Sequence, residues 1–204
     1  MDWGLGAADG GSAPVTVAEE TDLIRRILTG DAEAFSGLVD AYMAVGYRTA
    51  YRVLGHRQDA EDVLQDAFLQ ALRHIDQFEV GRPFLPWFLR IVVNRALSIR
   101  GRLARRAADE LSELEVDPSP GPALVTERAD AGGRVRAALA ALPERERMAV
   151  QLVELEGMTS AEAGEVLELP AGTVRWLLHR ARNELRMVLA PTQDWREGHY
   201  EGTA

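Results

Sequence analysis

The stretch that decides the fold is residues 159–189, TSAEAGEVLELPAGTVRWLLHRARNELRMVL. It predicts two helices joined by a tight turn. Thr159 and Glu162 have the spacing of a capping box, in which a hydroxyl and a carboxylate satisfy free backbone amides at a helix start. Pro170 cannot lie inside the first helix, because it has no N–H and its ring clashes with the preceding turn, but it can open the second helix. This arrangement is typical of a helix-turn-helix.

Arginines set the second of these helices apart from the rest of the chain. Residues 171–189 contain four arginines and one carboxylate, whereas the whole chain has a net charge of -9. Apolar residues at helical spacing predict a packed face on the same helix. They are Val174, Leu177, Leu178, Ala181, Leu185 and either Val188 or Leu189. Such a helix can bind phosphate, but a solvated basic face gives the same pattern, and the motif alone does not identify a function.

The composition excludes several chemistries. The 204-residue chain has no cysteine and no lysine, so all 23 basic residues are arginine. Disulfides, thiolate nucleophiles, cysteine-ligated zinc and Schiff-base or phosphate-loop lysines are therefore excluded. The four histidines are scattered without metal-binding spacing, and no nucleophile–base pair is evident. We expect no metal, no cofactor and no enzymatic activity.

The sequence also lacks membrane and export signals. No apolar run approaches the ~20 residues that span a bilayer, and the first residues have neither the basic nor the apolar segment of a signal peptide. We expect a cytoplasmic protein without membrane insertion. Residues 1–20 are predicted to be a disordered tail, and residues 191–204 a polar tail.

Charge is segregated along the chain and marks its domains. Residues 1–81 hold 6 arginines and 14 acidic residues, residues 82–106 hold 7 arginines and no acidic residue, and residues 107–131 hold 1 arginine and 7 acidic residues. The last segment includes the run Pro-Ser-Pro-Gly-Pro and is predicted to be an acidic, proline-stiffened linker. With helical periodicity on both sides and no strand pattern, we predict an all-α protein with two small domains, residues 21–106 and 132–190.

Residues 56–78 predict a helix with one acidic face. Asp59 is the predicted N-cap, with its side chain accepting from the amide of Asp62. The predicted buried stripe consists of Leu64, Phe68, Ala71, Leu72 and Ile75, and the opposite face of Glu61, Asp62, Gln65, Asp66 and Gln70. That face is either solvated or a docking surface for a basic partner.

Residues 84–106 combine aromatic and basic side chains on one predicted helix. Arginine neutralises phosphate, and aromatic or apolar pockets receive unstacked bases, so the combination suits single-stranded or distorted nucleic acid. Trp87 on its own is better explained as a core residue than as a base contact.

Four blocks, taken together and in order, resemble the bacterial sigma factors of the sigma-70 family, in their extracytoplasmic function (ECF) group. They are DAEAFSGLVDAYMAVGYRTAYRVLG (31–55), DAEDVLQDAFLQALRHIDQF (59–78), FLPWFLRIVVNRALSIRGR (84–102) and LPERERMAVQLVELEGMTSAEAGEVLELPAGTVRWLLHRARNELR (142–186). The resemblance covers about residues 31–189.

The resemblance implies a factor that binds core RNA polymerase, directs it to promoter DNA and helps to melt the duplex, with an anti-sigma factor as a further expected partner. Residues 21–106 would be sigma region 2 and residues 132–190 sigma region 4. The implied core-binding residues are Asp59, Glu61, Asp62, Gln65 and Asp66. Those for the minus-ten strand are Arg90, Asn94, Arg95, Arg100 and Arg102. Those for the minus-35 duplex are Thr173, Arg175, Trp176, His179, Arg180 and Arg182.

Some positions depart from the family pattern. The family usually has Lys-Ser-Arg-Leu where residues 175–178 read Arg-Trp-Leu-Leu, and Trp176 could contact a thymine methyl or a partner but cannot read a base edge with two hydrogen bonds. Glu168 stands where the turn normally has glycine, and Ala163-Gly164 replaces a bulkier pair. Two other functions stay open: a sigma mimic that titrates an anti-sigma factor, and a plain helix-turn-helix regulator.

Overall fold

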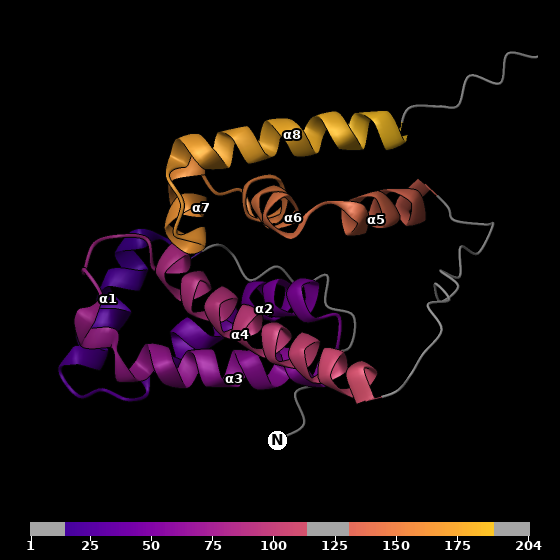
Figure 1. The fold of residues 1–204 in the computed structure, drawn as a ribbon. Coiled ribbons are helices and arrows are strands. Elements are labelled where there is room, and N and C mark those ends of the chain that lie inside the picture. Colours follow the sequence, from indigo (N-terminus) through magenta and orange to yellow (C-terminus); the bar gives the residue numbers. More distant parts are fainter. Residues whose placement is uncertain (1–14, 114–130, 190–204) are drawn as a thin grey trace, which may run out of the picture.

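The structure, a computed structural model, describes residues 15–113 and 131–189, and within these ranges it is helical with no strand (Figure 1). One isolated bridge joins Val80 and Arg82. The helices are α1 (Val17–Leu28), α2 (Ala34–Leu54), α3 (Arg57–Arg73), α4 (Phe84–Glu113), α5 (Ala131–Ala141), α6 (Glu144–Val150), α7 (Ser160–Leu167) and α8 (Ala171–Leu189). Short 3-10 and π-helical turns, η1 (Ile75–Gln77) and η2 (Gln151–Leu155), follow α3 and α6. The predicted all-α class is confirmed.

The predicted tails and linker fall mostly outside this range. Residues 1–14, 114–130 and 190–204 are not among the described residues. For these residues the expectations of a disordered start, an acidic proline-rich linker and a polar end stay predictions. The predicted bounds were too wide, because α1 already begins at Val17 and α4 continues to Glu113.

Helices α1 to α4 form the first unit, around an aromatic core. Phe84 and Phe88 of α4 are fully buried, and Phe88 stacks on Phe68 of α3 with ring centroids 4.5 Å apart. Tyr42 of α2 lies against both α4 rings. The long helix α4 packs against α2 and α3, so its outward face is held in a fixed orientation.

Helix α3 differs from its prediction in two details. Its N-cap is His56, whose ring accepts from the amide of Asp59, so the expected cap by Asp59 was wrong. Gly55 adopts a left-handed conformation (φ 71°) at the end of α2, which lets α3 begin at once. Leu72, which was predicted to be buried, is 39% exposed. It lies at the edge of the apolar stripe, and Val63 and Ala67 fill the interior of the stripe in its place.

A buried carboxylate ties the first unit together. Glu20 of α1 is 4% exposed and accepts hydrogen bonds from the hydroxyl of Tyr42 and from the amide of Phe84, the latter at 3.0 Å. Phe84 is the first residue of α4, where backbone amides lack intrahelical acceptors and negative charge is favoured. Burial raises the pKa of Glu20, and the bond from the Phe84 amide opposes that rise.

Helices α5 to α8 form the second unit, which contains the helix-turn-helix. The capping box is present: the Thr159 amide donates to Glu162 at 2.7 Å, and the Glu162 amide donates to the Thr159 hydroxyl at 3.2 Å. Pro170 lies directly before α8 and accepts from the amides of Thr173 and Val174. Of the predicted apolar face of α8, Val174, Leu177, Leu178 and Ala181 are buried, whereas Val188 is exposed.

The turn between α7 and α8 depends on a glycine. The amide of Leu169 donates to the carbonyl of Gly164 at 2.9 Å. A Cβ at position 164 would lie 2.5 Å from the carbonyl oxygen of Leu169, closer than any side chain can approach. The small residue at this position of α7 is therefore required by the sharpness of the turn.

The two units touch each other through α4 and α7 (Figure 1). Their buried apolar side chains form one continuous cluster. The arginine-rich helix of the first unit therefore lies beside the first helix of the helix-turn-helix.

Replacing Glu20 tests the buried tie. Glu20→Ala leaves two buried donors unpaired and should lower the free energy of unfolding by about 2–4 kcal/mol, measured by urea denaturation. Asp22→Ala, an exposed acidic position on the same helix, should change it by less than about 0.5 kcal/mol. Because the fold raises the pKa of Glu20, the wild type should lose stability relative to Glu20→Gln as the pH rises above the ordinary value of 4.5. Equal losses in the two alanine variants would contradict the role given to Glu20.

Gly164→Ala should destabilise the helix-turn-helix by about 1–3 kcal/mol, because the added methyl group meets backbone rather than a movable side chain. Gly172→Ala is the matched control: its Cβ would meet only the end of Arg175, at 3.8 Å, and alanine favours helix, so a gain of about 0.5–1 kcal/mol is expected. Thermal unfolding followed by circular dichroism compares the two. A loss in both variants would assign the effect to glycine content rather than to the turn.

Candidate nucleic-acid interface

A hollow of about 450 Å³ lies between α3 and α4 and collects part of the predicted minus-ten set. Arg90, Asn94 and Arg95 all line it. Its other lining residues are Gln70, His74, Gln77, Trp87, Ile91 and Ser98. Arg100 and Arg102 lie further along α4 and are not part of the hollow. The sequence therefore predicted five residues for one surface, and the structure brings three of them together.

Trp87 forms one wall of this hollow. Its ring lies edge-on to Phe78, with centroids 5.4 Å apart, and tilted against Phe84 at 5.5 Å. The side chain is only partly buried. One face of Trp87 is thus anchored in the aromatic core, while another part borders the hollow. The side chain is therefore compatible with both interpretations of the sequence, as a core residue and as a contact for an unstacked base.

Carboxylates engage the arginines of the hollow. The Arg95 guanidinium donates to Asp66 of α3, with Nε 3.1 Å from the carboxylate. The Arg90 guanidinium donates to Glu168 through Nε at 3.0 Å and through a terminal nitrogen at 2.6 Å, and the Asn94 amide lies 3.5 Å from the same oxygen. Hydrogen bonding from Arg90 lowers the pKa of Glu168, so this carboxylate stays ionised. These carboxylates occupy positions at which phosphate oxygens could bind the same donors.

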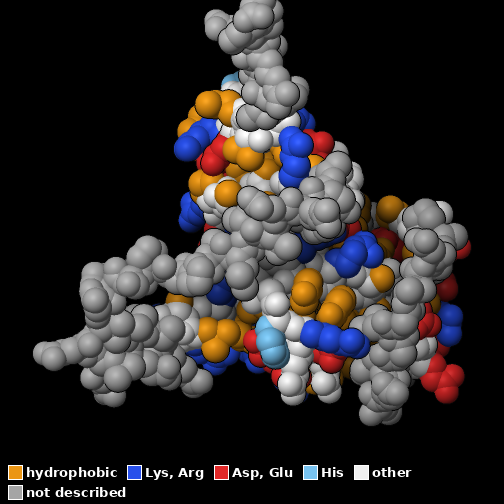
Figure 2. Space-filling view, turned by 90° about the vertical axis from the view of Figure 1, so that its right-hand side faces the viewer, with side chains coloured by type: hydrophobic (Ala, Val, Ile, Leu, Met, Phe, Trp, Pro, Cys, Tyr) orange, Lys and Arg blue, Asp and Glu red, His pale blue; other side chains and the backbone are white. Residues whose placement is uncertain are grey.

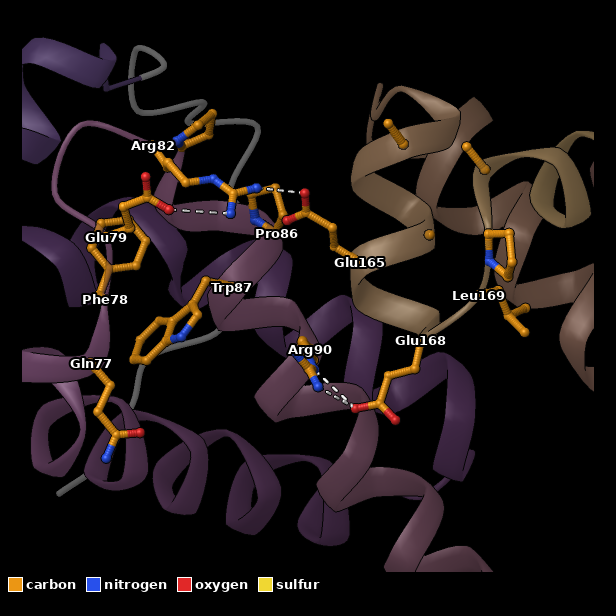
Figure 3. A pocket seen from close by; sticks show the side chains of 15 residues that line it. Gln77, Phe78, Glu79, Arg82, Pro86, Trp87, Arg90, Glu165, Glu168 and Leu169 are labelled. Carbon is orange, nitrogen blue, oxygen red and sulfur yellow. Dashed lines mark hydrogen bonds and ion pairs between the residues drawn. The ribbon is translucent and has the colours of Figure 1, made fainter.

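Arg82 belongs to the same surface and was not among the predicted site residues. It lies just before α4, donates to Glu165 of α7 at 2.5 Å and lies 3.6 Å from Glu79 (Figure 3). Arg82, Trp87 and Arg90 line a cavity of about 780 Å³ that the two units share. One sequence signal could have identified Arg82 as a site residue, because it begins the segment that contains arginines and no acidic residue.

The acidic face of α3 borders an apolar groove of about 280 Å³ against α2. Glu61, Asp62 and Gln65 lie on its rim. Its apolar lining comes from Phe35, Val39, Met43, Tyr47, Leu64, Phe68 and Leu69. Of the other predicted core-binding residues, Asp59 lies in the first turn of α3, and Asp66 turns toward Arg95 of α4.

Sequence reasoning missed the apolar half of this groove. Phe35 and Val39 share helical spacing with the buried Leu38 and Tyr42, yet each is only partly buried. Val39, Met43 and Tyr47 recur at intervals of four on α2, which is the signal that could have revealed a second apolar face.

The exposed face of α8 carries most of the predicted minus-35 set. Arg175, Trp176, His179, Arg180 and Arg182 are exposed, and Thr173 is partly buried. The Arg180 guanidinium lies 4.9 Å from the centre of the Trp176 ring and 3.4 Å from the buried Glu146. Arg182 donates to Glu154 at 3.2 Å. Arg180 and Arg182 are therefore held by carboxylates of their own unit.

Figure 2 views the molecule from the right-hand side of Figure 1 and shows arginines interspersed with hydrophobic side chains on both units.

Among residues 15–113 and 131–189, no three side chains of His, Asp or Glu are arranged to hold a metal ion. No helix in the same ranges has the length and hydropathy needed to cross a membrane.

Comparisons with known proteins match both units. Residues 38–107 match the family model of Sigma-70 region 2, and residues 132–185 match that of Sigma-70, region 4. The ECF RNA polymerase sigma factor SigW of Bacillus subtilis is 30% identical over 179 residues, covering 81% of this chain and 94% of the relative.

Solved structures agree with the fold. CnrH, solved in complex with the cytosolic domain of CnrY, is 29% identical with a TM-score of 0.61, over 84% of this chain and 97% of that one. The sigma factor RpoE of Bartonella quintana, solved with the anti-sigma factor NepR, has a TM-score of 0.64 at 22% identity, over 79% of this chain and 100% of that one.

Proposed function

The chain belongs to the sigma-70 family, in its ECF group, and directs transcription initiation, and from this premise we propose how its surfaces divide that task. The α2–α3 groove binds core RNA polymerase, the hollow on α4 binds the melted minus-ten strand, and α8 binds the minus-35 duplex. The chain itself catalyses no reaction.

The α2–α3 groove suits a helical partner with mixed chemistry. Its floor is apolar and its rim carries Glu61 and Asp62, which is the usual anatomy of a protein interface with an apolar centre and a polar border. The complementary surface would present apolar side chains flanked by cations. We assign it to the clamp helices of the largest polymerase subunit, in line with the resemblance of residues 59–78 to the family.

The hollow on α4 suits an unpaired strand. Arg90 and Arg95 supply cations for phosphates, Asn94 can donate to and accept from a base edge, and Trp87 offers a ring beside them. Arg100 and Arg102, further along α4, would contact the backbone on the way to or from the hollow.

The exposed face of α8 suits the major groove. In a helix-turn-helix the first residues of the second helix approach the base edges, and here these include Thr173, Arg175 and Trp176. Arginine can bind guanine with two hydrogen bonds, whereas the Trp176 ring offers apolar contact to a thymine methyl. His179, Arg180 and Arg182 would contact phosphates.

Two further parts of the proposal concern partners and location. RpoE was solved with an anti-sigma factor, and we assign an anti-sigma partner to this chain as well. Because polymerase and promoter DNA are in the bacterial cytoplasm, we propose that the chain acts there.

The observation that carries the proposal is the presence in one chain, in the family's order, of an acidic–apolar groove, an arginine–aromatic hollow and a helix-turn-helix. The test is transcription in vitro with purified core polymerase and genomic fragments that include the region upstream of the gene. We expect start sites that depend on the chain. Binding to core without transcripts would favour the sigma mimic, a function consistent with the exposed Trp176 on α8. Binding to duplex DNA without binding to core would favour a plain helix-turn-helix regulator.

Asp62→Arg should weaken binding to core polymerase at least about tenfold, because it places a like charge against a basic partner at the groove. Asp62 is preferable to Asp66, whose reversal would also break the ion pair with Arg95. Asp76→Arg, an exposed position on η1 outside the groove, is the control with the same change of charge. Core affinity is measured by fluorescence anisotropy, and equal affinities for both variants would remove the groove from the docking surface.

Arg175→Ala should lower the affinity of the polymerase holoenzyme for a promoter duplex by about 1–3 kcal/mol if Arg175 reads a base, with a change in preference at one minus-35 position. Arg186→Ala, on the last turn of α8, should have a smaller effect that is equal on all sequences. Binding to a set of single-base promoter variants at two salt concentrations measures both. A salt-dependent loss that is the same for every sequence would make Arg175 a phosphate contact.

A further inference from the structure

One large apolar side chain stands alone on the exposed face of α8. Trp176 is 53% exposed, and its neighbours on that face are the cationic or polar side chains of Arg175, His179 and Arg180. The next large apolar residue of α8 that is exposed is Met187, which lies about 16 Å further along the helix axis. Trp176 is therefore surrounded by DNA-binding residue types and is not part of an apolar patch of α8, as a protein-docking centre would be.

The start of α8 carries few side chains that are long enough to reach a base. Its first three residues, Ala171, Gly172 and Thr173, are short. Gly172 lies one turn before Trp176 on the same face, and a Cβ there would meet only the end of Arg175, at 3.8 Å. In a helix-turn-helix this end of the second helix approaches the base edges. Within residues 171–176, the long exposed side chains are therefore those of Arg175 and Trp176.

Two further residues hold the indole of Trp176 in place. The Arg180 guanidinium lies over the Trp176 ring, with its central carbon 4.9 Å from the ring centre. The Nε of Arg180 lies 3.4 Å from a carboxylate oxygen of Glu146, whose side chain is 3% exposed and is therefore fixed in the interior of the second unit. One face of the indole is thus covered by an anchored cation, and the exposed remainder is available for a ligand. An aromatic side chain that is oriented before binding loses less conformational entropy on binding.

The chemistry of the indole limits what it can recognise on DNA. Its ring is apolar and its single N–H donates one hydrogen bond, so it cannot read a base edge with two hydrogen bonds. The base edges in the major groove carry donors and acceptors, and the one apolar group among them is the C5-methyl group of thymine. 5-Methylcytosine carries the same methyl group at the same ring position. Contact between this group and an exposed indole is favourable, because both apolar surfaces leave water.

We propose that Trp176 is a specificity-determining residue that recognises the C5-methyl group of a pyrimidine in the minus-35 element. Arg180 and Glu146 are positioning residues for this contact, because they orient the indole. Thymine and 5-methylcytosine both provide the methyl group, so methylation of a cytosine at this position creates a recognition site rather than destroying one. The inference rests on the function proposed for α8.

Exchange of single methyl groups tests the contact. The polymerase holoenzyme is formed with the full-length chain, and its affinity for a promoter duplex is measured by fluorescence anisotropy. Each thymine of the minus-35 element is replaced in turn by uracil, and each cytosine in turn by 5-methylcytosine, so that each comparison changes one methyl group and no hydrogen-bonding group. We expect one position at which loss of the methyl group lowers the affinity about two- to fivefold. With a C·G pair at that position, 5-methylcytosine should bind more tightly than cytosine by a similar factor.

Variants of α8 assign the methyl preference to a side chain. Trp176→Ala should bind the methylated and unmethylated duplexes equally well, and Trp176→Phe, which keeps a flat apolar ring, should retain part of the preference. Met187→Ala, which removes an exposed apolar side chain from the far end of the same helix, is the matched control and should retain all of it. A minus-35 element in which no position responds to the methyl group would overturn the proposal, and so would an unchanged response in Trp176→Ala.

The positioning role is tested from both sides of the ion pair. Arg180→Gln, at an exposed position, and Glu146→Gln should each reduce the methyl preference while the preferences at the other minus-35 positions stay unchanged. Loss of every preference to the same extent would show that these residues only maintain the fold of the second unit.

The same measurements separate this inference from the function on which it rests. A wild-type holoenzyme with no preference for any promoter sequence would overturn the role proposed for α8 itself. A wild type that binds its promoter specifically but does not respond to the methyl group would overturn the role of Trp176 alone. Affinity for core polymerase is also measured without DNA, where Trp176→Ala should match the wild type, and a loss there would make Trp176 a protein contact instead.

Discussion

The fold depends on how the N-terminus of α4 is held. Glu20 joins α1, α2 and α4 by accepting from the Tyr42 hydroxyl and from the first amide of α4. A buried carboxylate is costly unless its oxygens are hydrogen-bonded, and here one donor contacts each oxygen. With its start fixed, α4 can present Arg90 and Asn94 on an outer face while Phe84 and Phe88 fill the core. The direction of this single helix therefore sets the position of the surface proposed for the DNA strand relative to the groove proposed for polymerase.

The same helix is where the two units meet, and this links the packing to the function. An outer face that binds phosphate must be basic, and a basic face in a chain of net charge -9 attracts the chain's own carboxylates. Glu165 and Glu168 of the second unit occupy that face in the structure. The surface proposed to bind DNA and the surface that holds the units together thus overlap.

Local sequence signals predicted much of the fold, and long-range contacts explain the rest. The capping box of Thr159 and Glu162, the helix boundary at Pro170 and the apolar face of α8 each depend on residues a few positions apart, so the pattern was visible. The role of Glu20 was not, because its partners lie 22 and 64 residues away and nothing nearby marks it as buried. Likewise, the pairing of Arg90 with Glu168 spans 78 residues. The sequence could propose which side chains bind phosphate, but only the packing of the units shows which carboxylates these side chains contact in the structure.

The absence of lysine has a consequence for how this chain can be regulated. A guanidinium keeps its charge at any cellular pH, and lysine acetylation, a common way to neutralise a DNA-binding surface, has no target among the 23 basic residues. The positive charge of α4 and α8 is therefore permanent. Its availability can change only through the groups placed opposite it, whether carboxylates of the same chain or of another protein. A partner that controls such a surface must therefore cover it, because neither lysine acetylation nor a change of pH can remove its charge.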